Sequence, residues 1–195
     1  MFEIKTQLGR DTLPFIDDFA QLRIKIFKSY PYLYDGSLEY EKNYLARYAE
    51  AKNFFLVTAY SSGKLIGAST ALPLDEEDIS LKKVFIDKGI DPKSIIYFGE
   101  SVVLPEYRGH GLGHRFFDER EAYAKSLKSI TTTCFCAVER PEKHPLRPAQ
   151  YSPLNTFWNS RGYTKDESLK ATFHWKDLDE KEESPKTMIF WTKHW

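Results

Sequence analysis

The chain has 195 residues, of which 42% are apolar, and this size and composition predict one domain with a sizeable core. Its 28 Lys and Arg residues balance its 28 Asp and Glu residues, so no bulk charge indicates a nucleic-acid partner. No segment approaches the roughly 20 apolar residues that span a membrane, and the first residues lack the apolar run of a signal peptide. Two closely spaced thiols, Cys134 and Cys136, form no disulfide framework and suit a reducing cytoplasm.

The first quarter of the sequence predicts one strand and two helices. Apolar and polar residues alternate over 2–8, which indicates a strand, and helical spacing over 12–27 indicates the first helix. An aromatic loop, 30–36, then leads to a second helix over 38–52.

The remaining sequence alternates strands with helices. In chain order we expect a hairpin of strands 54–60 and 65–72, a helix at 80–88, a long strand at 95–104, a helix at 111–128, a strand at 131–138, a proline-containing loop at 139–151, a short helix ending at Gly162, and strands at 169–175 and 186–191. This order predicts an α/β (α+β) fold, a mixed sheet with helices on both faces.

A glycine-rich turn, Arg108-Gly109-His110-Gly111-Leu112-Gly113, joins the long strand to the next helix. Free N–H groups at a helix N-terminus bind anions, and glycines let a pyrophosphate approach the backbone closely. The third glycine of the dinucleotide fingerprint would fall on His114 or Phe116, and no Gly-Lys-Ser/Thr follows as in a Walker loop. The turn alone therefore predicts either a phosphate site of another kind or a turn without function.

This turn resembles the acetyl-CoA loop of the GCN5-related N-acetyltransferase (GNAT) superfamily, written R/Q-x-x-G-x-G/A. Arg108, Gly111 and Gly113 match that motif, and the preceding apolar strand also fits. Downstream, 157–163 resembles the family's aromatic-x-x-x-Gly-aromatic segment. The resemblance covers roughly residues 54–191 in element order.

The resemblance implies a GNAT-like mixed, mostly antiparallel twisted sheet whose central parallel strands splay apart. It implies acetyl-CoA as cosubstrate, no metal, and direct attack by an amine acceptor, either a small molecule or a protein group. Residues 1–53 would supply the acceptor side and 54–195 the core with the acyl-CoA loop. The cofactor contacts implied by the resemblance are Val102, Val103, Leu104, Arg108, Gly109, His110, Gly111, Leu112, Gly113 and Trp158.

The catalytic residues are expected close to the splayed strand end. Glu100 is the candidate general base, and the alternative is a structural carboxylate paired with an arginine. The family often carries a tyrosine acid where this chain has Trp158, so Tyr151, from the enlarged loop, is the candidate proton donor. Tyr151 could equally be a packed aromatic residue, and Tyr97 offers another hydroxyl.

Two further alternatives stay open from the sequence. Without a tyrosine acid, the chain could be a catalytically weak acyl-CoA sensor, or a nucleotide-phosphate binder with no acyl chemistry. The loop 139–151 offers His144 and Arg147 to a substrate, or is a plain surface loop. The sequence predicts a monomer or a homodimer.

Overall fold

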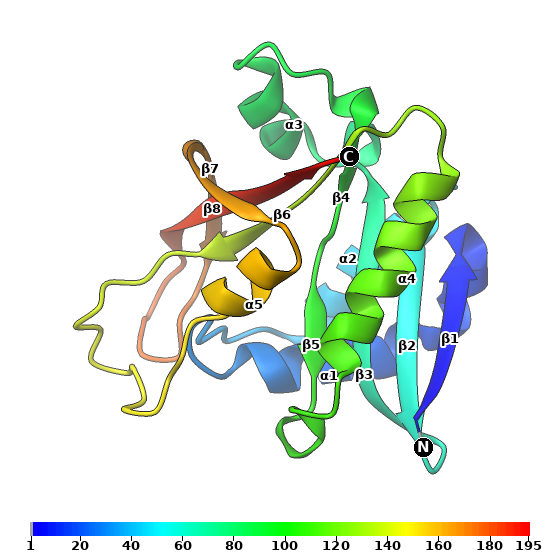
Figure 1. Ribbon diagram of the computed structural model, residues 1–195. Helices are drawn as coiled ribbons and strands as arrows, with labels where there is room; N and C mark the ends of the chain where they lie inside the picture. The colour runs from blue at the N-terminus through cyan, green and yellow to red at the C-terminus, as the bar shows by residue number, and fades with distance from the viewer. Residues whose placement is uncertain (1) are drawn as a thin grey trace.

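The computed structural model describes residues 2–195 and contains a twisted eight-stranded sheet (Figure 1). Along the sheet the strand order is β1-β2-β3-β4-β6-β8-β7, and β5 pairs with β3 beyond the end of β4. The strands are β1 (Glu3–Leu8), β2 (Phe55–Ser61), β3 (Lys64–Pro73), β4 (Ile95–Tyr97), β5 (Ser101–Val103), β6 (Thr132–Val138), β7 (Thr164–Trp175) and β8 (Ser184–His194).

Helices cover both faces of this sheet, with α4 and α5 on the near face of Figure 1 and α1 and α2 behind it. The helices are α1 (Ile16–Phe27), α2 (Leu38–Ala49), α3 (Ile79–Ile86), α4 (Leu112–Ser126) and α5 (Asn155–Ser160). Within residues 2–195, no helix is long and apolar enough to cross a membrane.

Every strand pairing is antiparallel except that of β4 with β6. A mixed, mostly antiparallel sheet with one central parallel pair confirms the fold that the sequence predicted. Apolar side chains form two clusters, of which one includes residues of α1 and α2 and the other includes Phe117 and Ala124 of α4.

The prediction of one long strand over 95–104 is wrong, because a β-bulge divides this segment into β4 and β5. Gly99 donates its N–H to the Thr70 carbonyl at 3.2 Å, while Thr70 donates to the Glu100 carbonyl at 3.1 Å. Two residues of one strand thus oppose a single residue of β3, which bends the bulged strand. A Cβ atom on Gly99 would lie 2.5 Å from Thr70 Oγ1, so only glycine fits there without a shift.

Two other boundaries also differ from the sequence prediction. The first α-helix begins at Ile16 rather than at 12, because 3-10 helix over Gly9–Phe15 contains Pro14, which lacks an N–H to donate. β7 starts earlier than predicted, at Thr164, and a register shift between Asp166 and Lys170 hides its alternation.

Candidate active site

The central parallel strands separate immediately after the bulge. β4 and β6 are in register from Ile95↔Thr132 to Tyr97↔Cys134, and Phe98 N–H donates a last bond to the Cys134 carbonyl at 2.7 Å. Beyond this point β5 pairs only with β3, and β6 only with β8. Figure 1 shows β5 and β6 running apart toward the turn that precedes α4. We call this opening between β5 and β6 the split.

Backbone groups of β5 face the split in alternation. Leu104 donates its N–H to the Ile66 carbonyl at 2.9 Å, and Thr70 bonds Glu100. Residues 104, 102 and 100 are therefore the hydrogen-bonded positions of the β3–β5 ladder, and Ser101 and Val103 are the non-bonded ones. The N–H groups of Ser101 and Val103 point away from β3 into the split. The resemblance implied backbone contacts from Val102, Val103 and Leu104. Of these, Val103 directs its N–H into the split, whereas the N–H groups of Val102 and Leu104 point toward β3.

The glycine-rich turn leads directly from β5 to α4. Gly109 and Gly111 have φ of 78° and 83°, a left-handed conformation that glycine adopts without strain. The first intrahelical bond runs from Arg115 N–H to the Gly111 carbonyl, so the N–H groups of Leu112 and Gly113 precede the helical ladder. Free N–H groups at a helix N-terminus, together with the helix dipole, can bind an anion.

Arg108 is the first residue of this turn, and one nitrogen of its guanidinium is held by a hydrogen bond. Its Nε donates to the Val103 carbonyl at 3.1 Å, and the Arg108 carbonyl lies 2.9 Å from His110 Nδ1. The residue is exposed. The remaining N–H groups of Arg108 are thus held beside the turn, where they can contact a phosphate.

Glu100 lies in the bulge with both carboxylate oxygens in contact with neighbouring groups. Oε1 accepts a hydrogen bond from Thr70 Oγ1 at 2.8 Å, and Oε2 is paired with the guanidinium of Arg23 from α1. Arg23 also pairs with Glu41 of α2. Burial alone would lower the pKa of Arg23, but Glu41 and nearby tyrosines raise the pKa above its ordinary value. The cluster holds two carboxylates and one guanidinium and so carries an excess negative charge.

A chain of buried polar groups continues from this cluster along α2. The Arg23 guanidinium lies 5.1 Å from the Tyr44 ring centre, Tyr44 and Tyr48 hydroxyls are 3.2 Å apart, and Tyr48 donates to Glu77 at 2.7 Å. Burial raises the pKa of Glu77. A cavity of about 10 Å³ lies between Glu77 and Glu100, room for one water molecule and for nothing larger.

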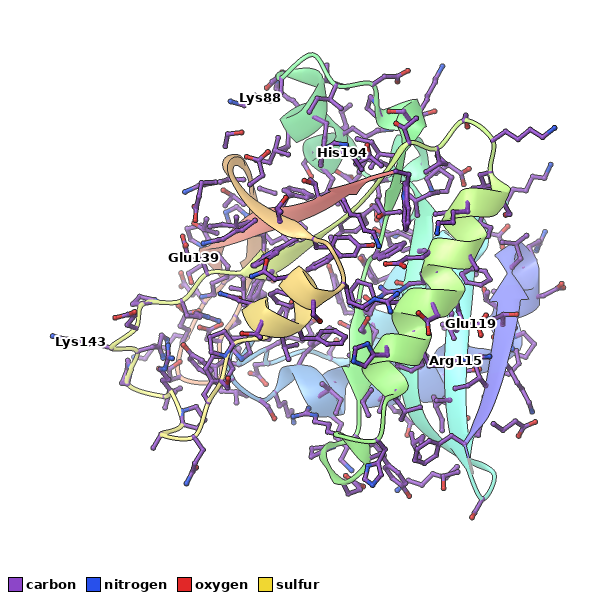
Figure 2. The ribbon with its side chains drawn as sticks, viewed as in Figure 1. Lys88, Arg115, Glu119, Glu139, Lys143 and His194 are labelled. Carbon is purple, nitrogen blue, oxygen red and sulfur yellow. The ribbon has the colours of Figure 1, made fainter. Side chains whose placement is uncertain are left out.

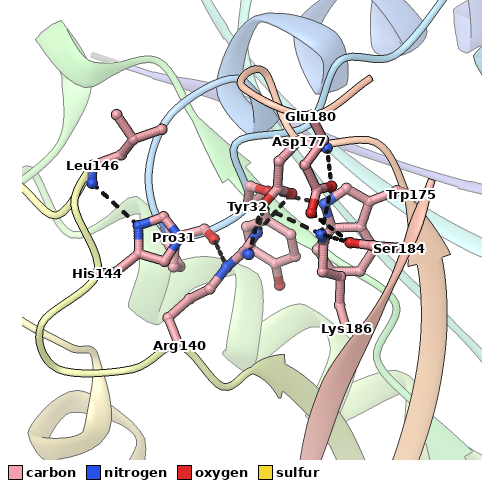
Figure 3. A network of polar contacts seen from close by, with 10 residues as sticks. All are labelled: Pro31, Tyr32, Arg140, His144, Leu146, Trp175, Asp177, Glu180, Ser184 and Lys186. Atoms are coloured by element: carbon pink, nitrogen blue, oxygen red, sulfur yellow. Dashed lines mark hydrogen bonds and ion pairs between the residues drawn. The ribbon is translucent and has the colours of Figure 1, made fainter. Parts of the chain in front are cut away.

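The loop 139–151 is tied to the segment between α1 and α2 by Arg140. Arg140 donates to the carbonyls of Pro31 at 2.7 Å and Tyr32 at 2.8 Å, and pairs with Asp177 at 2.6 Å (Figure 3). Trp175 donates its indole N–H to the same Tyr32 carbonyl at 3.0 Å. Three segments that are distant in sequence therefore form one wall, here called the acceptor wall, comprising 30–35, 139–151 and 175–186.

Tyr151 packs within this wall. Its ring meets Tyr30 edge-on with centres 4.6 Å apart, and the Arg147 guanidinium lies 5.2 Å from its centre. Burial, chiefly, raises the pKa of Tyr151. The ring centres of His144 and Tyr30 lie 5.7 Å apart. Lys143, by contrast, points away from the body of the protein (Figure 2). Tyr151 thus lies in the wall formed by 30–35, 139–151 and 175–186, with its ring packed against Tyr30.

The sequence and the fold both match known proteins. Residues 18–147 match the sequence profile described as the Acetyltransferase (GNAT) family. The chain belongs to the GNAT acetyltransferase family. It is an acetyl-CoA-dependent N-acetyltransferase whose acceptor is an amine.

Solved structures share the GNAT fold along the whole chain. A ribosomal-protein-alanine N-acetyltransferase from Brucella melitensis aligns with a TM-score of 0.63 at 12% identity, covering 99% of both chains. The PaiA N-acetyltransferase of Thermoplasma acidophilum, in complex with coenzyme A, gives 0.58 at 14% identity, covering 100% of this chain and 99% of that one. An acyl-CoA N-acyltransferase from Pseudomonas aeruginosa gives 0.58 at 15%, covering 99% of each. A search of curated proteins found no match.

Within this GNAT fold, Trp158, one of the cofactor contacts implied by the resemblance, packs against strands of the sheet. Its ring packs against Phe135 and Trp191, with centres 5.1 and 5.0 Å apart. Phe157, one residue earlier, touches the start of α4 instead. A Cβ atom on Gly113 would lie 3.3 Å from the Phe157 ring, and His114 packs on the same ring at 4.9 Å.

Three site arginines were missed from the sequence: Arg23, Arg120 and Arg140. Arg23 and Arg120 occupy apolar stripes of their helices, since Arg23 lies between Ala20 and Phe27 and Arg120 between Phe116 and Ala124. A charged residue on an apolar stripe was the available signal. Arg140 had no such signal, because its partners come from two segments that are distant in sequence, Pro31 and Tyr32 from one and Asp177 from the other.

Proposed function

We propose that this GNAT enzyme binds acetyl-CoA with its pyrophosphate on the turn 108–113 and its pantetheine arm in the split. The observation that carries this proposal is the alignment of three parts. An unpaired strand edge at β5 leads into a left-handed glycine turn, which leads into the open N-terminus of α4. An extended chain ending in a pyrophosphate matches that sequence of donors. The side chains of Arg108 and Phe157 flank the anion site.

The thioester carbonyl lies at the start of β5 in this proposal. The N–H groups of Ser101 and Val103 face the split, and such a donor stabilises the oxyanion of a tetrahedral intermediate. The amine nitrogen attacks the carbonyl carbon, the oxyanion forms and collapses, and coenzyme A leaves as a thiolate. No metal takes part.

Direct attack is supported by the state of the two thiols near the split. Cys134 and Cys136 are both buried, and Cys136 Sγ lies 3.2 Å from the Tyr97 hydroxyl. Burial raises the pKa of Cys136 to about 12 and that of Cys134 well above its ordinary value. Both thiols stay protonated at neutral pH, so neither is a nucleophile for a covalent intermediate.

We propose a positioning role for Glu100 rather than the role of general base. Both carboxylate oxygens of Glu100 are occupied, Oε2 by the Arg23 guanidinium and Oε1 by the Thr70 hydroxyl, so neither is free to take a proton from the acceptor amine. With Glu41, Glu100 instead gives this side of the split a negative charge that attracts an ammonium group. Tyr151 lies on the acceptor wall, and we propose that it contacts the acceptor there.

The acceptor amine approaches from the acceptor wall in this proposal. The aromatic rings of Tyr30 and Tyr151, the imidazole of His144 and the guanidinium of Arg147 lie together on this wall. The first helices and the loop 139–151 then frame the acceptor, which is a small molecule or a protein amino group. Peptide N-termini and small amines are the first candidate acceptors. One structural relative is named as a ribosomal-protein-alanine N-acetyltransferase and another as an acyl-CoA N-acyltransferase.

The test is release of free coenzyme A thiol from acetyl-CoA with a panel of spermidine, lysine, an alanine-starting peptide and an aminoglycoside. Turnover with at least one amine is expected, together with a rise in melting temperature on adding acetyl-CoA. Binding without turnover on any amine would favour an acyl-CoA sensor. Neither binding nor turnover would remove the coenzyme A assignment.

A further inference from the structure

Arg120 of α4 is a fully buried arginine without an acidic partner. Only 2% of its surface is exposed, and no carboxylate lies within ion-pair distance among residues 2–195. The neighbouring carboxylates are paired elsewhere, since Glu119 binds Arg115 and Glu121 binds Arg161 and Lys193. Burying an unpaired charge is costly, so a folded protein that retains one needs another use for it.

Aromatic rings and backbone carbonyls surround this guanidinium. The ring centres of Phe98 and Phe117 lie 4.2 and 4.8 Å from its carbon, close enough for cation–π attraction. Its Nε donates to the Phe116 carbonyl at 3.2 Å. Burial lowers the pKa of Arg120 to about 9, so the group is still charged at neutral pH.

A terminal nitrogen of Arg120, Nη1, points at the bulge. Nη1 lies 3.4 Å from the carbonyl oxygens of both Thr70 and Glu100, the two acceptors that the bulge shares with the sheet. On the opposite face of the sheet, Arg23 of α1 pairs with the carboxylate of the same Glu100. Two arginines from helices on opposite faces therefore hold one residue at the point where the strands separate.

The carbonyl that Arg120 contacts belongs to the same peptide group as the Ser101 N–H. That N–H is one of the two that face the split. Hydrogen bonding of a cation to the carbonyl polarises the peptide, and a polarised peptide is a stronger N–H donor. A donor fixed in this way, before substrate arrives, stabilises a developing oxyanion without reorganisation.

We propose that Arg120 is a positioning residue for acetyl transfer, which fixes and polarises the Glu100–Ser101 peptide so that the Ser101 N–H binds the thioester carbonyl. This inference rests on the proposed function in one respect, that acetyl-CoA occupies the split. In the reaction the amine nitrogen bonds to the carbonyl carbon, and the carbonyl electron pair moves to oxygen. Ser101 N–H donates to that oxyanion. The carbonyl then re-forms as the carbon–sulfur bond breaks, the thiolate carries away the electron pair, and the amine proton passes to water.

The test reads the thioester carbonyl directly and needs no acceptor. Acetyl-CoA labelled with carbon-13 at the carbonyl is bound to the protein, and its stretching band is recorded by isotope-edited infrared spectroscopy. The wild type should shift this band to lower frequency than in free acetyl-CoA, because a hydrogen bond weakens the double bond. Arg120→Met should lose most of that shift while the Kd for acetyl-CoA changes by less than about tenfold, roughly 1.4 kcal/mol.

A control variant and a second Arg120 variant complete the experiment. Arg115→Met removes an exposed arginine one to two turns away on the same helix, paired with Glu119, and should keep the full shift (Figure 2). If Arg120→Met does not fold, Arg120→Lys retains the charge but lacks the planar fork, and it too should show a smaller shift.

Three results would be decisive against the inference. A full wild-type shift in either folded Arg120 variant would overturn it, as would a bound acetyl-CoA band at the free position in the wild type. If the wild type does not bind acetyl-CoA at all, the proposed function itself fails, and that outcome is visible before any variant is made.

Discussion

Arg140 and Asp177 form a two-point ion pair inside the acceptor wall. Nη1 lies 2.6 Å from one carboxylate oxygen and Nη2 lies 2.9 Å from the other. Both side chains are less than 10% exposed, and Lys186 approaches the same carboxylate at 3.4 Å. The pair fixes Arg140 so that its other donors reach the carbonyls of Pro31 and Tyr32. The three segments of this wall are therefore held together by contacts within the protein itself.

Replacing Asp177 should cost stability as well as order at this end. Asp177→Ala leaves Arg140 buried without its carboxylate, and breaking such a pair from one side destabilises by about 3–5 kcal/mol. The midpoint of urea unfolding reports the loss. Asp179→Ala, at an exposed position two residues away, should change the free energy of unfolding by no more than about 0.5 kcal/mol. Equal effects of the two substitutions would contradict the role given to Asp177.

Glu100→Gln separates a positioning role from general base catalysis. Loss of a general base costs about 10²–10⁴-fold in rate, whereas loss of a positioning contact should cost about tenfold or less. The acidic limb of kcat/KM against pH should persist with the same midpoint, because Arg23 and Thr70 occupy both carboxylate oxygens of Glu100. Once an amine substrate is identified, its pH–rate profile provides the measurement. Disappearance of the acidic limb would restore Glu100 as the base.

Local pattern was enough to predict the sheet, the helices and the turn. The glycines at 109 and 111 are recognisable because left-handed backbone before a helix requires glycine, and both have positive φ. The hairpin around Gly63 followed from periodicity in the same way, whereas the central parallel pair of β4 and β6 was implied by the family resemblance.

What could not be predicted depends on distant contacts. The bulge at Gly99 and Glu100 lies between two apolar runs, 95–98 and 102–104, and its pairing with Thr70 on β3 defines it. For the same reason the sequence could not say whether Glu100 is free or paired, because Arg23 comes from a helix 77 residues earlier. Trp158 matched a motif position, yet the packing of Phe135 and Trp191 decides where its ring lies.

The turn can be tested with a pair of glycines of similar backbone geometry. Gly111 and Gly63 have φ of 83° and 76°, and a Cβ atom on either would meet nothing within 4 Å. Alanine at either position therefore introduces comparable backbone strain, about 1–2 kcal/mol. Only Gly111→Ala should weaken the binding of coenzyme A, because this substitution also disturbs the N–H groups at the start of α4.

Calorimetric titration of coenzyme A measures this difference, with Arg108→Ala as a second probe of the anion site. Removing a hydrogen bond to a charged group costs about 1.5–3 kcal/mol, so Arg108→Ala should raise Kd by roughly 10- to 100-fold. If Gly63→Ala weakened the binding of coenzyme A as much as Gly111→Ala did, the cause would be general backbone strain. The turn would then no longer be assigned as the pyrophosphate site.

The buried thiols should make stability fall in mildly alkaline solution. The pKa of Cys136 rises from 9.0 to about 12 on folding because of burial, and that of Cys134 also rises. The unfolded chain therefore releases these thiol protons at lower pH than the folded one does. The folded state then binds more protons, so the free energy of unfolding decreases as pH increases above about 9. The stabilisation is complete below pH 9 and is lost progressively up to about pH 12.

Urea unfolding between pH 8.5 and 10 isolates this effect, because tyrosines in the unfolded chain ionise mainly above a pKa of about 10. The Cys134→Ala/Cys136→Ala double variant should be less stable overall but should show a flatter dependence on pH. It should also retain thiol release from acetyl-CoA, since neither sulfur is proposed to carry the acetyl group. A slope as steep as that of the wild type would mean that other groups set the alkaline stability. Loss of acetyl transfer in a folded double variant would reopen the question of a covalent intermediate.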